Sequence, residues 1–208
     1  MTDLNQALVE IRSIRRQVAQ TTEFRGYGPA TLFSTATLAV IAGVVQAHWL
    51  PDPSTHTAQY VALWLGTGIF CAALIGSQML ARANRIHSSM ADEMIRMAVT
   101  QFLPSAIVGV VLPFLLLRVT QNLFWILPGL WQIVFGLGVF ACCRCLPRAM
   151  VLAGVWFLLT GMGCIALGDA RALAPFTMSV AFCVGMVLVA AIHYFSAKRV
   201  SSDDDEEL

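Results

Sequence analysis

Six apolar runs, separated by short polar connections, dominate the pattern of hydrophobic and polar positions along this chain. A helix of about 20 apolar residues crosses a hydrocarbon core of about 30 Å, and each run is close to that length. The runs cover residues 29–50, 58–80, 99–117, 123–142, 149–167 and 176–195. The pattern therefore predicts an all-α fold, a polytopic membrane protein with six transmembrane helices in one bundle.

An amphipathic helix is predicted before the first run. Leu4, Leu8 and Val18 share one face at helical spacing, while Glu10 and Gln17 lie on the opposite face. Such a helix can lie in the membrane interface, dock onto a cytoplasmic partner or pack beneath the bundle, and the pattern leaves these three open. We expect a cytoplasmic or interfacial amphipathic helix over 1–27, the six-helix transmembrane domain over 28–197 and a disordered acidic cytoplasmic tail over 198–208.

The fourth run separates small and polar residues from aliphatic ones when it is wound as a helix. One face carries Trp125, Gly129, Gln132 and Gly136, and the opposite face carries Leu127, Leu130, Val134 and Leu137. Small residues let membrane helices approach closely, and an amide bonds to a neighbouring helix. We therefore expect the first face to pack on other helices and the second to meet lipid. The predicted partner of Gln132 is Thr160 or a carbonyl freed by a proline.

Gly68, Ala72 and Gly76 form another stripe of small residues, at intervals of four along the second run. The stripe predicts a close helix contact, either inside the bundle or with another copy of the chain in a homo-oligomer. Three prolines inside the runs are expected to bend their helices, because each removes a backbone donor. They are Pro104, Pro113 and Pro128.

The charges are few and unevenly placed. Charged residues make up 12% of the sequence, against roughly 25% in soluble domains, and the formal net charge is +1. Of the 13 Lys and Arg residues, only Arg118 and Arg171 lie in the connections on one side, which leaves 11 on the other. The positive-inside rule then predicts a multi-pass membrane protein with both termini cytoplasmic, and the resemblance described below implies that the membrane is the bacterial inner membrane. Because the basic residues are scattered over short loops, no nucleic-acid partner is predicted.

A cluster of cysteines ends the fourth run. Cys142 and Cys145 have the spacing of half a zinc site, and His193 and His87 are predicted on the same side of the membrane. No second pair with this spacing accompanies them, so we expect no bound metal and no cofactor. The alternatives for these thiols are inert packing and a redox response.

The sequence predicts no catalytic residues. No Asp, Glu, Lys or Arg lies deep within an apolar run, and there is no glycine-rich phosphate loop and no HExxH motif. Ion-coupled carriers typically keep an ionisable group within the membrane. The pattern therefore argues against a proton pump and an enzyme, and it leaves a channel or a flippase open.

The chain contains the runs FRGYGP, VALWLG, QFLPS and LPGLWQIVFGLGVFACCRCLPRA. In these runs, and over nearly its whole length, it resembles an uncharacterised bacterial family of small six-span integral membrane proteins. That family has no established activity, so the resemblance implies a six-span fold and no catalytic residues. The plan of an amphipathic helix followed by six spans is also similar to that of small permease subunits of ABC transporters.

These patterns together favour a structural or regulatory membrane protein that acts through membrane lipids or through a protein partner at the cytoplasmic face. A transporter or channel component is the first alternative, and a continuous polar cavity would favour it. A thiol- or metal-dependent membrane enzyme is the second alternative. A water-accessible cluster of Cys142, Cys145 and a histidine would favour that one.

Overall fold

The computed structural model describes residues 29–86, 89–119, 121–143 and 149–205, and no strand occurs among them. The predicted N-terminal amphipathic helix lies outside the described residues. The long helices are α2 (Pro29–Trp49), α3 (Thr57–Ile86), α4 (Ser89–Val119), α5 (Leu127–Cys142), α6 (Met150–Ala166) and α7 (Pro175–Asp205). Two short 3-10 helices, η1 (Gln121–Ile126) and η2 (Ala170–Leu173), precede α5 and α7.

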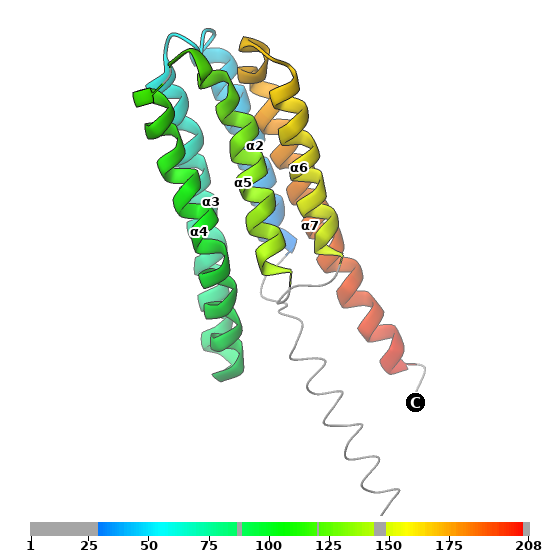
Figure 1. Ribbon diagram of the computed structural model, residues 1–208. Helices are drawn as coiled ribbons and strands as arrows, with labels where there is room; N and C mark the ends of the chain where they lie inside the picture. The colour runs from blue at the N-terminus through cyan, green and yellow to red at the C-terminus, as the bar shows by residue number, and fades with distance from the viewer. Residues whose placement is uncertain (1–28, 87–88, 120, 144–148, 206–208) are drawn as a thin grey trace, which may run out of the picture.

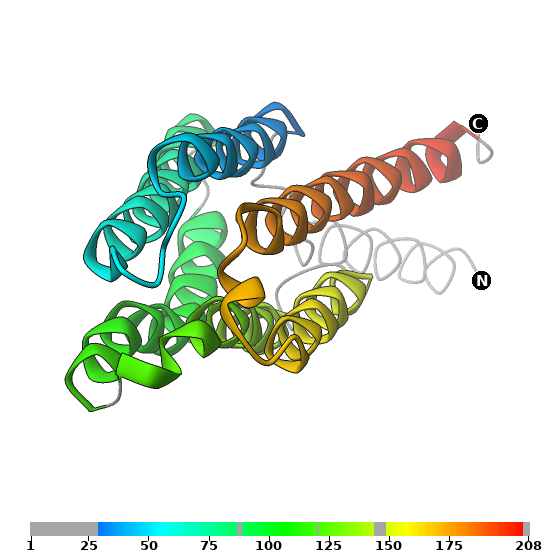
Figure 2. The same ribbon diagram turned by 90° about the horizontal axis from the view of Figure 1, so that it is seen from above.

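The long helices run antiparallel to their sequence neighbours and form two layers (Figures 1 and 2). One layer contains α3, α2 and α7, and the other contains α4, α5 and α6. Each helix contacts the next one along the chain, and α7 packs along α2, so that the helices close into a ring. We call the end that holds η1, η2 and residues 50–56 the loop end, and the opposite end the terminal end.

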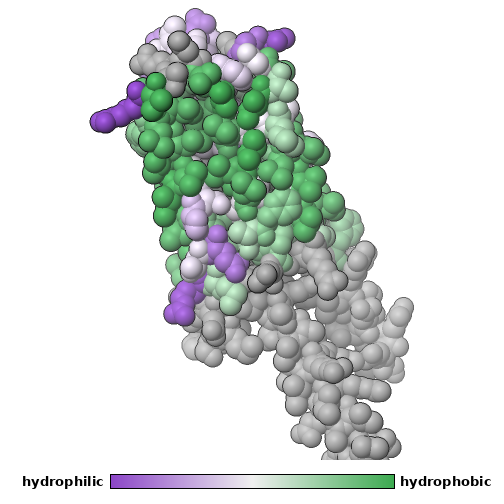
Figure 3. All heavy atoms as spheres, viewed as in Figure 1, coloured by the Kyte–Doolittle hydropathy of each residue, from purple (hydrophilic) through white to green (hydrophobic). Residues whose placement is uncertain are grey.

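Among the described residues, α2, α3, α4 and α7 are long and apolar enough to cross a membrane, and so is the stretch Leu123–Cys142, which joins the end of η1 to α5; α6 is a shorter apolar helix. The predicted all-helical bundle is confirmed at this level. Large apolar side chains cover the outside of the bundle, and Figure 3 shows them as a broad band with polar residues gathered at the loop end. A polar strip also enters this band from the terminal end, over α4.

The fourth predicted span is not a single α-helix. Its first residues belong to the 3-10 helix η1, and α5 begins only at Leu127. The physical reason is Pro128, which has no N–H to donate to the carbonyl of Phe124, as an α-helix through this point requires. Pro128 instead occupies the first turn of α5, where no such bond is needed. The change of helix type thus lies next to Pro128, inside the candidate span Leu123–Cys142, and a bend of the span at this proline stays a prediction.

Two other helices extend past the predicted runs. α4 begins at Ser89 rather than at 99 and continues through both Pro104 and Pro113. α7 runs to Asp205, so residues 198–205, for which the sequence predicts a disordered tail, are helical. Extending an existing helix forms one backbone hydrogen bond for each residue fixed, and a helix nucleated in an apolar run therefore continues into adjoining polar sequence.

Two buried apolar clusters fill the bundle, one near each end. The loop-end cluster consists of Ala42, Leu50, Tyr60, Val61, Trp64, Phe124, Leu127, Trp131, Leu173 and Met178, with leucines of α3 and α4 packed against it. The terminal-end cluster consists of Leu32, Ala36, Val139, Met150, Ala153, Met186, Val189, Ala190 and Ile192. The described residues of the second cluster come from α2, α5, α6 and α7. We call these four helices the core, and α3 with α4 the α3–α4 pair.

Candidate functional site

Buried polar side chains hold the helices to one another, and Gln46 on α2 does so most directly. Its Nε2 donates to the carbonyl of Leu173 at 2.7 Å, and its Oε1 accepts from Trp64 Nε1, also at 2.7 Å. The side chain of Gln46 is fully buried. One amide thereby joins α2 both to α3 and to η2, the short helix that precedes α7.

Trp131 joins α5 to α4 through a carbonyl that a proline has freed. Pro113 lies inside α4 and has no N–H, so the carbonyl of Gly109, four residues earlier, lacks its usual helical donor. The indole Nε1 of Trp131 donates to this carbonyl at 2.7 Å. Pro113 is fully buried at this contact. The proline therefore supplies α4 with an acceptor for the neighbouring helix.

Two further bonds join neighbouring helices in the same manner. The indole Nε1 of Trp156 on α6 donates to the carbonyl of Ala181 on α7 at 2.9 Å. Near the terminal end, the Sγ of Cys142 on α5 donates to the carbonyl of Ala98 on α4 at 3.4 Å. In each case a side chain from one helix binds the backbone of the next.

Gln132 lies fully buried on α5 and reaches across to α7. Its Nε2 donates to the carbonyl of Thr177 at 3.2 Å, with Met178 Sδ 3.7 Å away. The prediction of a partner on another helix is confirmed, although no proline frees this carbonyl. Thr160, the other predicted partner, donates instead to the carbonyl of Trp156 within its own helix.

Two buried oxygen atoms in this region have no hydrogen-bond partner among the described residues. They are Tyr60 Oη and Gln132 Oε1, and both side chains are 0% exposed. Tyr60 lies within electrostatic range of the Cys164 thiol, and the Sγ of Cys164 and the Oγ1 of Thr177 both donate to the carbonyl of Ala172. Because buried polar groups are nearly always paired, these two oxygens mark positions at which a water or a ligand atom can bind.

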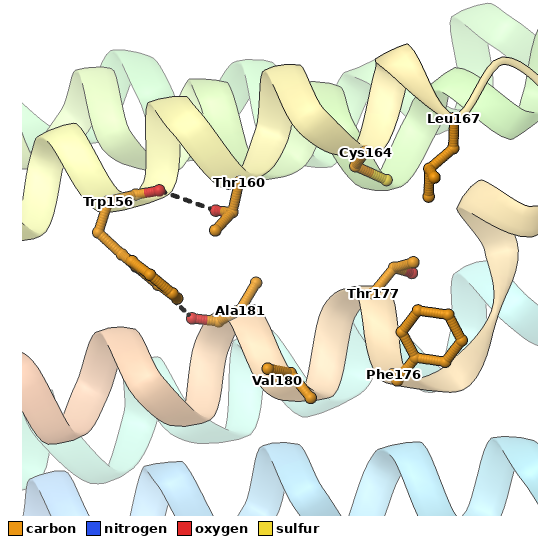
Figure 4. Close-up of a pocket in the computed structure, with 8 residues that line it drawn as sticks. All are labelled: Trp156, Thr160, Cys164, Leu167, Phe176, Thr177, Val180 and Ala181. Atoms are coloured by element: carbon orange, nitrogen blue, oxygen red, sulfur yellow. Dashed lines mark hydrogen bonds between the residues drawn. The ribbon is translucent and has the colours of Figure 1, made fainter.

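A groove of about 230 Å³ lies between α6 and α7 toward the loop end (Figure 4), and one of its wall residues, Thr177, provides the carbonyl to which Gln132 donates. Its walls are Trp156, Thr160, Cys164, Leu167, Phe176, Thr177, Val180 and Ala181. The polar atoms of these walls already have partners: Thr160 Oγ1 donates to the carbonyl of Trp156 at 2.9 Å, and Thr177 Oγ1 to that of Ala174, between η2 and α7, at 2.7 Å. The Trp156 indole and the Cys164 thiol do the same, as described above. The surface that a molecule bound in the groove would contact is therefore almost entirely apolar.

The rim of the groove at the loop end is formed by the connection between α6 and η2. Gly168 has φ of +74°, a left-handed conformation that glycine adopts without strain, and its N–H donates to the carbonyl of Ile165 at 3.1 Å. This geometry ends α6. It places Asp169 and Arg171 directly after the helix.

Asp169 and Arg171 form an exposed ion pair on this rim. Asp169 accepts from the backbone N–H of Arg171 at 2.8 Å and from the guanidinium Nε at 3.0 Å. The Arg171 side-chain hydrogen bond holds the pKa of Asp169 below its usual range. The guanidinium Nη2 also donates to the carbonyl of Leu167, a residue of the groove wall, at 3.1 Å. The pair is thereby fixed next to the mouth of the groove.

The predicted packing face of α5 lies against other parts of the bundle. A Cβ built on Gly129 would lie 2.7 Å from the carbonyl oxygen of Gly161, and one on Gly136 would lie 3.0 Å from that of Gly154, so both glycines face α6. Trp125 packs, partly buried, against the loop-end cluster. Together with Gln132, these residues surround the α5 side of the site.

The predicted lipid face of α5 is right only in part. Leu137 is 52% exposed, and Leu130 and Val134 are half-buried. Leu127, in contrast, is 0% exposed and belongs to the loop-end cluster, so its assignment to lipid is wrong. The reason is that Leu127 lies at the loop end, where η2 contacts α5 and residues such as Leu173 and Met178 pack in the same cluster.

The stripe of small residues on α3 has no neighbour inside the bundle. Among the described residues, nothing lies within 4 Å of a Cβ built on Gly68 or Gly76, and Ala72 is exposed. The alternative of a contact inside the bundle is therefore wrong for these glycines. The alternative of a contact with another copy of the chain stays a prediction.

The candidate metal ligands are only partly described. Cys142 and His193 are buried near the terminal ends of α5 and the apolar part of α7, while Cys145 and His87 lie outside the described residues. Within the part of the chain that the structure describes, no group of three or more His, Cys, Asp or Glu side chains is placed to hold a metal ion. The carbonyl of Ala98 is the described partner of the Cys142 thiol.

The sequence interpretation missed Tyr60, Trp64 and the ion pair on the rim. A signal for part of the site was present: Trp64, Trp131 and Trp156 lie well inside apolar runs, away from the interfaces where tryptophan is usually enriched. A tryptophan at such a depth needs an acceptor for its indole N–H, which here is an amide or a carbonyl on the next helix. No such signal exists for the ion pair, because its position beside the groove depends on how α6 and α7 diverge.

No protein-family model matches this chain, and searches of the curated proteins and of the solved structures gave no match. Its function is therefore inferred from its own residues.

Proposed function

We propose that this protein is an integral membrane protein with a structural or regulatory role, without catalytic activity of its own, and that it acts through membrane lipids or a partner protein. The observation that carries this proposal is the use of the interior polar groups. Gln46, Trp131 and Trp156 each bind the backbone of a neighbouring helix. Groups held in this way fix the helices relative to one another and are not available to a substrate.

The outer surface supports the membrane setting of this proposal. Large apolar side chains such as Phe70, Leu115 and Phe195 are more than half exposed on three different helices. Monomeric soluble proteins rarely expose apolar surface on this scale, whereas lipid covers it at no cost. The asymmetry of basic residues supports an orientation with both termini in the cytoplasm.

A labelling experiment on the full chain tests the insertion and the orientation. Membranes washed with alkaline carbonate should retain the protein. A cysteine placed at Ser54, on the exposed 50–56 connection, should react with an impermeant thiol reagent in intact cells, whereas one at Ser88, outside the described residues, should react only after permeabilisation. The unsubstituted chain, with its own cysteines, is the control. Release by carbonate would overturn the membrane proposal, and labelling at Ser88 in intact cells would overturn the orientation.

A transporter component is a second candidate, and one observation favours it. Tyr60 Oη and Gln132 Oε1 are buried polar atoms without a described partner, as expected of groups that bind a solute within a membrane. The structural role predicts that proteoliposomes with the purified chain release solutes and protons no faster than empty liposomes. A faster flux that Gln132→Leu abolishes and Val134→Leu preserves would replace the structural role with transport. Val134 is the matched control because it lies half-buried on the same helix.

A further inference from the structure

We propose that the groove between α6 and α7 binds one acyl chain of a phospholipid, and that Asp169 and Arg171 select a headgroup with both a phosphate and a primary ammonium, as in phosphatidylethanolamine. This inference rests on the proposed function and deepens it, because it names the lipid class and the place where it binds. Three features of the described residues carry it: the chemistry of the walls, the length of α6 and the charges of the rim.

The walls of the groove suit hydrocarbon. Phe176 and Val180 are 61% and 53% exposed, so the groove opens on the outside of the bundle, where lipid is the solvent. Figure 4 shows the side chains of Thr160 and Cys164 on α6 facing those of Thr177 and Ala181 on α7 across the opening. Their hydroxyl and thiol hydrogens are donated to carbonyls of the protein, so a water in the groove would find few partners. An acyl chain needs none and gains contact with both helices.

The length of α6 sets the depth of the rim. The helix has 17 residues, which at 1.5 Å per residue is about 25 Å, shorter than the hydrocarbon core of about 30 Å. Gly168 ends the helix at this length through its positive φ. When a helix is shorter than the hydrocarbon core, the bilayer thins around it and the lipid headgroups lie closer to the helix end. Asp169 and Arg171 are therefore held at the depth of the phosphates, above a groove that lies at the depth of the acyl chains.

The rim offers both signs of charge. Of the five N–H groups of Arg171, Nε donates to Asp169 and one on Nη2 donates to the carbonyl of Leu167, which leaves three for a phosphate. Arginine binds phosphate through paired hydrogen bonds. The second oxygen of Asp169, Oδ2, also accepts from Nε at 3.0 Å, and because a carboxylate has about four lone-pair sites it can still accept from an ammonium N–H. A phosphatidylglycerol headgroup would place no cation near Asp169, and a phosphatidylcholine headgroup has no N–H to donate.

Trp156 provides a direct test, because it is part of the groove wall. The full chain is reconstituted in nanodiscs that contain phosphatidylethanolamine, phosphatidylglycerol or phosphatidylcholine with brominated acyl chains, which quench a tryptophan in contact with them. The difference between the wild type and Trp156→Phe isolates the signal of Trp156. We expect phosphatidylethanolamine to reach half-maximal quenching at a mole fraction about 10-fold lower than the other two, the preference that one charge-assisted hydrogen bond gives.

Two variants with matched controls separate the groove from the rim. Val180→Phe fills the groove and should abolish the quenching of Trp156, whereas Val187→Phe, at a site on α7 that is 40% exposed and outside the groove, should preserve it. Arg171→Gln should remove the preference for phosphatidylethanolamine while quenching persists, and Arg118→Gln, an exposed arginine at the same end, should leave the preference intact. Thermal unfolding of each variant checks that it is folded.

Three results would contradict the proposal. Equal quenching in Val180→Phe and the wild type would overturn the groove as the binding site. Equal quenching by the three lipids in the wild type would overturn the headgroup selection, and so would a preference for phosphatidylglycerol. These failures are distinct from a failure of the proposed function, since a chain that is released from membranes by carbonate never reaches this test.

Discussion

α6 and α3 both carry glycines along an apolar helix, yet only α6 has glycines, Gly154 and Gly161, that face a neighbour among the described residues. A Cβ on Gly161 would lie 2.7 Å from the carbonyl oxygen of Gly129, and one on Gly154 would lie 2.9 Å from the ring of Phe140. A Cβ on Gly68 or Gly76 of α3 would have nothing within 4 Å among the described residues. Glycines in an apolar helix thus allow close packing between α5 and α6, whereas on α3 they leave a face without a neighbour among the described residues.

The hydrogen bonds show the same contrast. Between described residues, no side-chain hydrogen bond joins α3 to α4; α3 is bonded to the core through Trp64 and α4 through its carbonyls at Gly109 and Ala98. Among the side chains that the structure describes, which exclude residues 82–95, neither helix contributes to the terminal-end cluster. Regions with few buried contacts open more readily than the rest of a protein. We therefore expect the α3–α4 pair to open first, from the terminal end, and the core to resist longest.

The largest effect should come from the glycines themselves. Gly161→Leu forces α5 and α6 apart, because the nearest atom is a backbone oxygen that cannot turn away, and it should destabilise the protein by about 3 kcal/mol or more. Gly68→Leu, on the open face of α3, should be neutral or stabilise by up to about 1 kcal/mol through helix propensity. Unfolding in detergent by added denaturant measures both. Equal losses in the two variants would remove the contrast between the core and the α3–α4 pair.

Gln46→Leu tests the bond by which α3 is attached to the core. The change leaves the Trp64 indole N–H and the Leu173 carbonyl buried without partners, which should cost about 2 kcal/mol. Hydrogen exchange of the amides in α3 should rise more than that of α5 or α6. Gln78→Leu, an exposed amide on α3, is the control and should stay within about 0.5 kcal/mol of the wild type. A uniform rise in exchange across all helices would show that α3 does not open separately.

Trp131 and Pro113 should be coupled by about 1 kcal/mol in a double-mutant cycle. Trp131→Phe leaves the Gly109 carbonyl unpaired, whereas in a Pro113→Ala background the restored N–H at position 113 can pair with it, so the same change should cost less. Pro104→Ala combined with Trp131→Phe is the matched control and should be additive. Thermal unfolding of the four members gives the coupling. Additive effects for Pro113 would mean that the proline does not supply the acceptor.

The smallest effect is a pH dependence at the rim of the groove. The folded pKa of Asp169 lies below its ordinary value of 3.8 because of the Arg171 side-chain hydrogen bond. A depressed carboxyl pKa adds stability that is complete above about pH 5 and is lost as the pH falls through the folded value. The transition lies between about pH 5 and about pH 3. Between these two values, the melting temperature of the wild type should therefore fall slightly more than that of Asp169→Asn. The control is Asp52→Asn, in the other loop, and its melting temperature should change with pH like that of the wild type. An identical change in all three proteins would show that the ion pair does not contribute to stability.

The sequence alone determined that the protein is helical and where most of its helices lie. Burial of apolar side chains depends on local composition, and a run of about 20 such residues has few alternatives to a helix. It also determined that Gln132 must bond to another helix, because an amide in an apolar run finds no water. The boundary at Pro128 could have been read from the sequence as well, since the missing N–H is a local property.

Only the tertiary structure decided which helices meet. Nothing in their spacing distinguishes Gly68 from Gly161, and only the arrangement of the two layers gives one of them a neighbour. Leu127 is buried because Leu173 and Met178 pack in the same cluster, and Asp169 lies beside the groove because α6 ends at Ala166, directly before the connection to η2. Hydrophobic burial is non-directional and can be read residue by residue, whereas hydrogen bonds and close backbone contacts are directional and exist only once two particular helices lie side by side.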